Sequence, residues 1–196
     1  MHRLSASFVL AYHGCDQTVA DGLLNGQPFR TSQNDYDWLG HGIYFWEANP
    51  RRGLEWAQET AARKASSIKN PAVIGAVIDL RFCLDLTTSS GILQIQSAYE
   101  RLRSLYKILD LIDGTQMPRN DTRRKRHNLD CAVVNLLHDA REQENLPAFD
   151  TVKGAFLEGD AAYETSAFNT KTHIQICVRN SDCIRGVFRV PDQDLT

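Results

Sequence analysis

Residues 40–47 read GHGIYFWE, and residues 12–14 read YHG. The longer stretch predicts a strand from Gly42 to Trp46, because its β-branched and aromatic residues are those that strands favour. The shorter one ends an apolar run from Ser7 to Tyr12, so that a strand would carry the His13 imidazole at its tip. Each fragment alone fits an ordinary core strand, and only their order and spacing along the chain make them informative.

Outward from these two stretches, the chain shows separate helix and strand signals. Helices are expected where apolar residues recur every three or four positions, and strands where aliphatic runs are bounded by turns. Helices are predicted over 17–24, 50–66, 89–112 and 128–141, and further strands over 72–80, 150–157, 172–178 and 183–190. Because strands gather at both ends of the chain with helices between them, an α+β domain is favoured over a regularly alternating parallel sheet.

The composition fits one domain. A chain of 196 residues with 42% apolar residues can bury one substantial core. We expect a single domain over residues 1–196, with a helical insertion over about 89–145. The formal net charge of -2 provides no overall basic field, so nucleic-acid binding would require a local basic patch.

The cysteines and the N-terminus bear on the cellular setting. Five cysteines are spread along the chain without the close pairs that a structural zinc site needs, and a reducing cytosol is the simplest setting for them. The apolar run from Phe8 to Tyr12 is too short for a signal peptide or a membrane span, so a cytoplasmic protein without a membrane anchor is expected. The pair His138-Asp139 has no companion cluster, which favours a helix-surface pair over a metal site.

In the order of its motifs, the chain resembles the ADP-ribosyltransferase superfamily, in particular the branch with poly(ADP-ribose) polymerase catalytic domains and diphtheria-type toxins. The resemblance rests on His13-Gly14, on Gly40-His41-Gly42-Ile43-Tyr44-Phe45, and on Trp56 in the helix that follows. It continues into AVIGAVIDLRFCLDL and THIQICVRNSDCIRGVFRV, which look like a central strand and the last two strands of the family. The resemblance implies a split β-sheet core, and it does not extend to the helical middle of the chain.

The resemblance also implies that NAD⁺ is the substrate and that no metal is required. His13 would hydrogen-bond a ribose hydroxyl, and Gly14 would present its backbone N–H and C=O to the nicotinamide carboxamide. Tyr44 and Trp56 would hold the pyridinium ring between two aromatic faces. Gly42 would let its strand pass close to the ligand.

The third catalytic position departs from the family pattern. Polymerising members carry a glutamate near the start of the penultimate strand, and an ungapped alignment places Gln175 there, with His173 on the same strand face. Either residue could act on the substrate or serve only in cross-strand hydrogen bonding. Glu158 or Glu164, in the loop before that strand, could supply a carboxylate instead, and Glu158 is the better placed. Loss of the family glutamate favours transfer of a single ADP-ribose unit over chain elongation.

Two further positions bear on the dinucleotide. Arg30 lies where the family often places a loop that contacts phosphate or ribose, although a lone loop arginine is usually solvated. Cys15 replaces the serine that usually follows His-Gly in the family, which puts that ribose contact in question.

One concentrated basic segment, Arg119 to His127, includes Arg123, Arg124, Lys125 and Arg126. It could follow a phosphate backbone, or it could be a solvated loop between two helices. Small transferases of this superfamily are often toxins of toxin–antitoxin or phage-defence systems, and several modify nucleic acid. The leading hypothesis is therefore a mono-ADP-ribosyltransferase that acts on a macromolecule, with RNA or DNA ahead of protein, and an antitoxin as a further partner to consider. The alternatives are an NAD⁺ glycohydrolase and a non-catalytic module that binds NAD⁺ or ADP-ribose.

Overall fold

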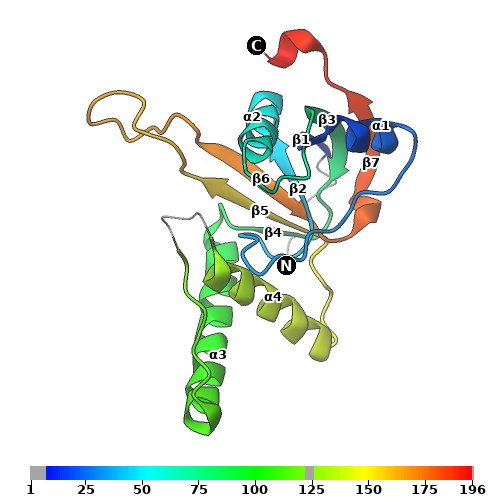
Figure 1. Ribbon diagram of the computed structural model, residues 1–196. Helices are drawn as coiled ribbons and strands as arrows, with labels where there is room; N and C mark the ends of the chain where they lie inside the picture. The colour runs from blue at the N-terminus through cyan, green and yellow to red at the C-terminus, as the bar shows by residue number, and fades with distance from the viewer. Residues whose placement is uncertain (1–7, 122–125, 196) are drawn as a thin grey trace.

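The computed structural model describes residues 8–121 and 126–195. In these residues the fold is mixed, with one seven-stranded sheet flanked by helices (Figure 1). The strands are β1 (Phe8–Asp16), β2 (Ile43–Glu47), β3 (Pro71–Asp79), β4 (Cys83–Asp85), β5 (Thr151–Phe156), β6 (His173–Val178) and β7 (Ile184–Arg189). The helices are α1 (Gln17–Leu24), α2 (Pro50–Ala61), α3 (Ser89–Asp113) and α4 (Asn128–Gln143), with short 3-10 turns η1 (Ser181–Cys183) and η2 (Asp192–Leu195).

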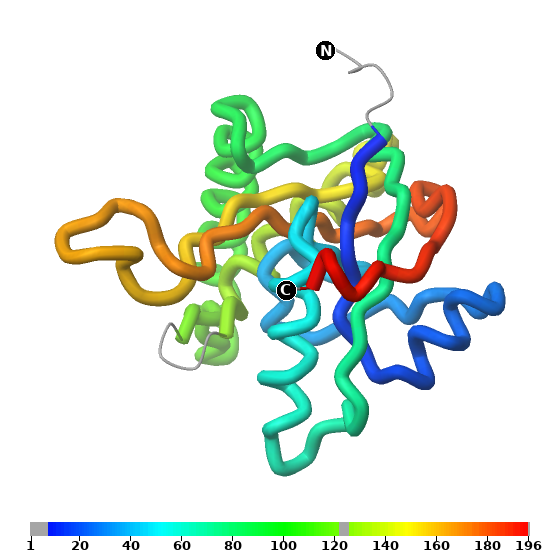
Figure 2. Tube along the Cα trace, turned by 90° about the horizontal axis from the view of Figure 1, so that it is seen from above, coloured from blue at the N-terminus to red at the C-terminus, as the bar shows by residue number. Residues whose placement is uncertain are grey.

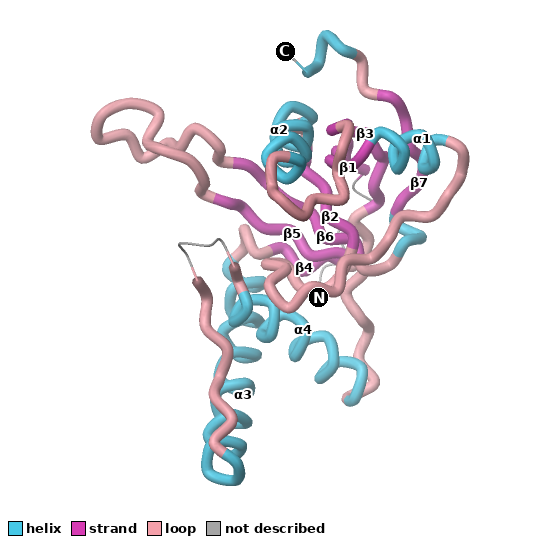
Figure 3. The backbone as a smooth tube through the Cα atoms, viewed as in Figure 1, coloured by secondary structure: helices cyan, strands magenta, loops and turns pink. Residues whose placement is uncertain are grey.

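The sheet joins strands from both ends of the chain. Its order is β4-β5-β6-β2-β1-β3-β7, so that β6 and β7 lie beside β2 and β3. β4 pairs with β5 in parallel, and the other described pairs are antiparallel. Figure 3 shows α3 and α4 together at one end of the sheet, beyond β4. The mixed architecture, with helices inserted between two groups of strands, agrees with the α+β prediction.

The two faces of the sheet bury different elements. On one face, called here the α1 face, Ala11, Phe45 and Ile176 belong to a buried cluster, and α1 packs beside it. On the opposite face, called the α2 face, α2 packs against β1 and β3. Further along the α2 face, α4 contributes Val134 to a cluster that includes Val152. Because side chains alternate along a strand, neighbouring residues of β2 point to opposite faces.

β1 is longer than predicted. It continues through His13 and Gly14 to Asp16, so the predicted end at Tyr12 is wrong. The strand ends where the Asp16 carboxylate caps α1, accepting a hydrogen bond from the Thr18 N–H (3.0 Å). The other carboxylate oxygen accepts from the backbone N–H groups of residues 69 (2.7 Å) and 70 (2.9 Å), and together these bonds hold the pKa of Asp16 well below its usual range.

The helix predictions are close in position and less accurate at their ends. α1 and α3 lie where they were predicted, and α3 ends at Gly114, whose φ of 76° suits the left-handed conformation of a helix C-cap. α2 ends at Ala61 instead of about residue 66. β4 was not predicted, because three residues carry too little pattern to identify a strand. No helix in the described part of the chain is both long and apolar enough to cross a membrane.

Candidate functional site

β1 and β2 diverge directly beside the motif residues. Two residue pairs join these strands, and the last of them places Tyr12 opposite Trp46. In an antiparallel ladder, the next rung facing the same way would pair Gly14 with Tyr44. That rung is absent from the described β1–β2 pairing, which leaves a gap between Gly14 and Tyr44 that we call the fork.

The direction in which Gly14 presents its backbone follows from its neighbours. The N–H of Ala48 donates to the carbonyl of Leu10 (2.9 Å), so Leu10 turns its backbone groups toward β2. By the two-residue alternation of the ladder, Gly14 does the same, while His13 turns its backbone groups toward β3. Gly14 therefore offers one donor and one acceptor side by side at the fork, which complements a primary carboxamide.

The imidazole of His13 bridges the fork. Its Nδ1 lies 2.8 Å from the Tyr44 carbonyl oxygen. Since a carbonyl oxygen can only accept, Nδ1 carries the proton and donates. Burial lowers the pKa of His13, so the ring is neutral near pH 7 and Nε2 keeps an acceptor lone pair. The ring packs on Phe29 and Phe45, with centroids at 5.5 and 5.6 Å, and these contacts place it on the α1 face.

Gly14 is pressed against α2 on the other face. A Cβ at residue 14 would overlap the carbonyl oxygen of Gly53 and would lie 3.2 Å from the ring of Trp56. Only a glycine fits this approach without a shift of strand or helix. The structure thus brings Gly14 and Trp56 close together, and the nicotinamide contacts expected of them stay a prediction.

The side chain of Tyr44 is held in place by its hydrogen bonds. Its hydroxyl donates to the Gly40 carbonyl (2.7 Å) and accepts from the Leu39 N–H (2.9 Å), and burial raises the pKa of Tyr44 far above its usual value. The ring that lies against Trp56 is Trp46, with centroids 5.5 Å apart. The side chains of Tyr44 and Trp46 both lie on the α2 face. Only Trp46 pairs with Tyr12, and α2 packs across β1 at that position. Tyr44 is therefore anchored to the turn before β2, and its predicted part in holding a pyridinium ring together with Trp56 stays a prediction.

The two polar residues of β6 lie beside this aromatic pair. The register places Gln175 opposite Trp46, and the His173 ring lies 6.4 Å from that of Trp46. His173 is buried and stacks on Phe156, with ring centroids 5.3 Å apart and planes within 9°. Its Nδ1 donates to the Lys171 carbonyl (2.7 Å). Gln175 and His173 share a face, as predicted.

Glu158 lies against α2 through an arginine that the sequence did not single out. The side chain of Arg52 is only 5% exposed, and its Nη2 lies 3.0 Å from a Glu158 carboxylate oxygen. Glu59 lies 3.6 Å from the same guanidinium and 2.6 Å from the amine of Lys171. These ion pairs fasten both ends of the β5–β6 connection to α2. The rest of that connection projects from the sheet (Figure 2), and Glu164 is exposed within it.

The remaining dinucleotide candidates lie in three settings. Arg30 is exposed in the connection after α1. At Gly42 a Cβ would overlap the Cys177 sulfur, so this glycine serves close packing against β6. Burial raises the pKa of the Cys15 thiol to about 11, so the thiol is protonated near pH 7.

The basic segment is only partly described. Arg123, Arg124 and Lys125 lie outside the described residues. Arg126 is exposed, with its guanidinium carbon 5.3 Å from the centre of the Tyr36 ring. His127 stacks on Trp38 at 4.7 Å, in front of α4.

The His138-Asp139 pair does not form the predicted surface feature. Asp139 is exposed, but His138 is buried and its Nδ1 donates to the Val134 carbonyl (2.8 Å). Residue 138 lies on the inward side of α4, so the helix-surface interpretation is wrong for the histidine. Among the described residues, no group of three or more His, Cys, Asp or Glu could hold a metal ion.

Three residues near the fork were missed at the sequence level. Arg52 and Trp46 follow the recognised motif, but a helix arginine and a strand tryptophan are common, and only their burial makes them notable. Phe156 becomes relevant because the β5–β6 pairing sets it opposite His173. The Trp46 Nε1 is a buried donor without a hydrogen-bond partner among the described atoms. The sequence could not indicate this, because it depends on the tertiary structure.

The comparisons with known proteins are sparse. No family model and no solved structure matches the chain. The chain is similar to the uncharacterized protein MJ0359 of Methanocaldococcus jannaschii, with 25% identity over an alignment of 193 residues that covers 89% of this chain and 83% of that protein. The similarity spans most of both chains, so the two share more than an isolated motif.

Proposed function

We propose that this protein is a mono-ADP-ribosyltransferase that uses NAD⁺ and modifies a macromolecule. The proposal combines the family resemblance of the two motifs with one observation, the missing rung between β1 and β2. Beside that gap, Gly14 has a donor and an acceptor turned toward β2 and an aromatic ring, Trp56, against its Cα. A carboxamide attached to a flat ring has matching groups, and nicotinamide is such a compound.

The surrounding residues suit the rest of the dinucleotide. The Nε2 lone pair of neutral His13 can accept a hydrogen bond from a ribose hydroxyl. The guanidinium of Arg52 is buried on α2 and can pair with an anionic group once Glu158 moves aside. Arg52 is therefore a better candidate for a phosphate contact than the exposed Arg30.

The chemistry requires little beyond positioning. The bond between ribose C1′ and the nicotinamide nitrogen breaks, and nicotinamide leaves with the electron pair. The acceptor nucleophile forms the new bond to C1′ and gives its proton to a base. Glu158, His173 and Gln175 surround this region, and the first two could accept that proton.

Glu158 can be tested as the base. Glu158→Gln keeps a hydrogen-bond acceptor for Arg52 but removes the charge. If Glu158 takes the acceptor proton, kcat should fall by about a hundredfold or more while KM for NAD⁺ changes little. Lys171→Met, which removes the ion pair to Glu59 on the same loop but leaves the Glu158 side chain and its bond from Arg52 in place, is the matched control. A normal kcat for Glu158→Gln would direct attention to His173.

The proposed function is tested by incubating the purified protein with NAD⁺ labelled in its adenine moiety and with cell extract. We expect label to enter macromolecules, and Trp56→Ala to abolish this, whereas Phe8→Ala, at an exposed aromatic residue at the start of β1, should leave NAD⁺ consumption intact. Release of free ADP-ribose alone would favour the glycohydrolase alternative. NAD⁺ that remains unconsumed under all conditions would refute the proposal.

A further inference from the structure

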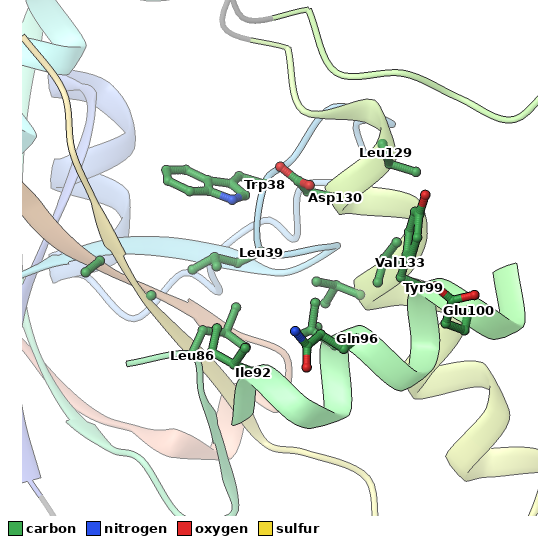
Figure 4. Close-up of a pocket in the computed structure, with 14 residues that line it drawn as sticks. Trp38, Leu39, Leu86, Ile92, Gln96, Tyr99, Glu100, Leu129, Asp130 and Val133 are labelled. Carbon is green, nitrogen blue, oxygen red and sulfur yellow. The ribbon is translucent and has the colours of Figure 1, made fainter. Parts of the chain in front are cut away.

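A second site lies beside the fork, on the α2 face. It is a pocket of about 630 Å³ between α3, α4 and β5 (Figure 4). Trp38, Leu86, Ile92, Tyr99 and Val133 supply apolar and aromatic walls. Sites for small organic groups typically measure about 300–1,000 Å³, so the pocket can hold a planar ring system.

The polar lining of the pocket includes two carboxylates. Gln96, whose amide can donate and accept, and Glu100 lie on α3, and the Asp130 carboxylate, from α4, points toward Trp38 (Figure 4). No lysine, arginine or histidine is among the described residues that line the pocket. The carboxylates accept hydrogen bonds from N–H donors, and their side-chain partners, Arg103 (3.4 Å from Glu100) and His127 (3.2 Å from Asp130), lie outside the lining. The occupant is therefore flat, largely apolar and equipped with an amino group.

Basic residues stand in the α3–α4 connection, which leads into the lining residues Leu129 and Asp130. The Asn120 side chain accepts hydrogen bonds from the backbone N–H groups of Leu129 (2.9 Å) and Asp130 (3.2 Å), which fixes the α3–α4 connection against the first turn of α4. Arg119 precedes this anchor, and the exposed Arg126 lies at the other end of the connection. Cations in this connection and carboxylates in the pocket match a nucleotide whose phosphates stay outside while its base enters.

The pocket adjoins the residues of the fork. Gly154 lines the pocket and pairs with Gln175 across β5 and β6. The next pair on the same face sets Phe156 opposite His173. A base in the pocket would thus lie one strand away from the polar residues of β6.

We propose that this pocket binds a nucleobase with an exocyclic amino group, adenine, cytosine or guanine, from a single-stranded nucleic acid. The identification of that strand as the ADP-ribose acceptor rests on the proposed function. Base binding itself requires no NAD⁺, so the two ideas can fail separately.

The test measures binding of fluorescent single-stranded oligonucleotides by anisotropy, without NAD⁺. Oligo-dA and oligo-dC are compared with oligo-dT, whose base lacks an amino group, and with an abasic strand of equal charge. We expect oligo-dA and oligo-dC to bind at least about fivefold more tightly than oligo-dT, which corresponds to about one discriminating hydrogen bond. The abasic strand should bind most weakly.

Two variants examine the pocket itself. Ile92→Trp places a ring at an exposed lining position on α3 and should reduce the affinity for oligo-dA to that for oligo-dT. Asp130→Asn should reduce the preference for amino-bearing bases, and Asp139→Asn, an equal charge change on an exposed face of the same helix, should not. Because Asp130 also lies 3.2 Å from His127, Ile92→Trp serves as the variant that leaves this pair intact.

Equal affinity for all four strands, or unchanged base preference in Ile92→Trp, would overturn the nucleobase assignment. Base-selective binding with no NAD⁺ turnover would retain the pocket and refute the proposed function. Labelling of a macromolecule without base-selective binding would support the proposed function and refute the nucleobase pocket.

Discussion

The fork and the outer half of α3 differ sharply in how tightly they are packed. At the fork, Phe45 is fully buried and Trp46 is 3% exposed. On α3, beyond the contact with α4, Leu111 is 87% exposed and Ile112 is 72% exposed. The first region is enclosed by elements on both faces of a sheet, whereas the second projects from its single partner helix.

This difference indicates which region can hold chemistry in place. At the fork, pairing of β1 with β3 and of β2 with β6 fixes the directions of the backbone N–H and C=O groups. A side chain near the tip of α3 has no such restraint. We therefore expect substitutions at the fork to change function and stability together, and those at the α3 tip to change neither.

The largest effect is expected for Gly14→Ala. The new Cβ would overlap the Gly53 carbonyl oxygen, so β1 or α2 must shift and the backbone groups of residue 14 move. NAD⁺ turnover should fall by at least about a hundredfold and stability by about 1–3 kcal/mol. Gly186→Ala, on β7 with open space around its Cα, is the control for turnover and for urea unfolding. Normal turnover by Gly14→Ala would disconnect the fork from the activity.

A smaller effect is expected for substitutions of His13, which distinguish the roles of its two ring nitrogens. In His13→Asn the side-chain amide can replace Nδ1 as donor to the Tyr44 carbonyl, but nothing replaces Nε2. We expect near-normal unfolding in urea and a loss of about tenfold in NAD⁺ affinity, measured by calorimetry. His13→Gln should retain more affinity and lose more stability. If both variants bind NAD⁺ normally, Nε2 does not contact the dinucleotide.

His138 provides a pH-dependent measure of packing between α4 and the sheet. Burial lowers its pKa to about 4, assisted by the charges of Arg179 and Arg141. The unfolded chain binds this proton near pH 6.5, so stability is full above that pH and falls as the pH drops toward 4. The loss attributable to His138 is about 3 kcal/mol. His138→Leu should make the free energy of unfolding less dependent on pH between about 6.5 and 4. His127→Leu, at the other end of α4, should not have this effect.

The smallest effect is expected at the α3 tip. Leu111→Lys should change the free energy of unfolding by less than about 0.5 kcal/mol, because the side chain is already in water. Leu102→Ala, in the part of α3 that packs on α4, should cost about 2–4 kcal/mol. A large loss in Leu111→Lys would mean that the tip is covered by a partner or a second copy of the chain.

Local signals in the sequence sufficed for most elements. The Asp16 cap, the Gly114 stop and the alternation within GHGIYFWE act over a few residues, and the corresponding helices and strand lie where they were predicted. The extension of β1 past Tyr12 was missed because it depends on pairing with β3, which is distant in the sequence. The short β4 was missed because three residues carry too little pattern to identify a strand.

In the candidate site, too, some features follow from local sequence and others from tertiary structure. The sequence by itself determined which residues meet at the fork, His13, Gly14 and Trp56, because motif order places them on consecutive elements. Tertiary structure alone decided that Trp46 and not Tyr44 lies against Trp56, and that Arg52 holds Glu158. Those choices depend on strand register and on how α2 crosses β1, and neither is encoded within any one stretch of the chain.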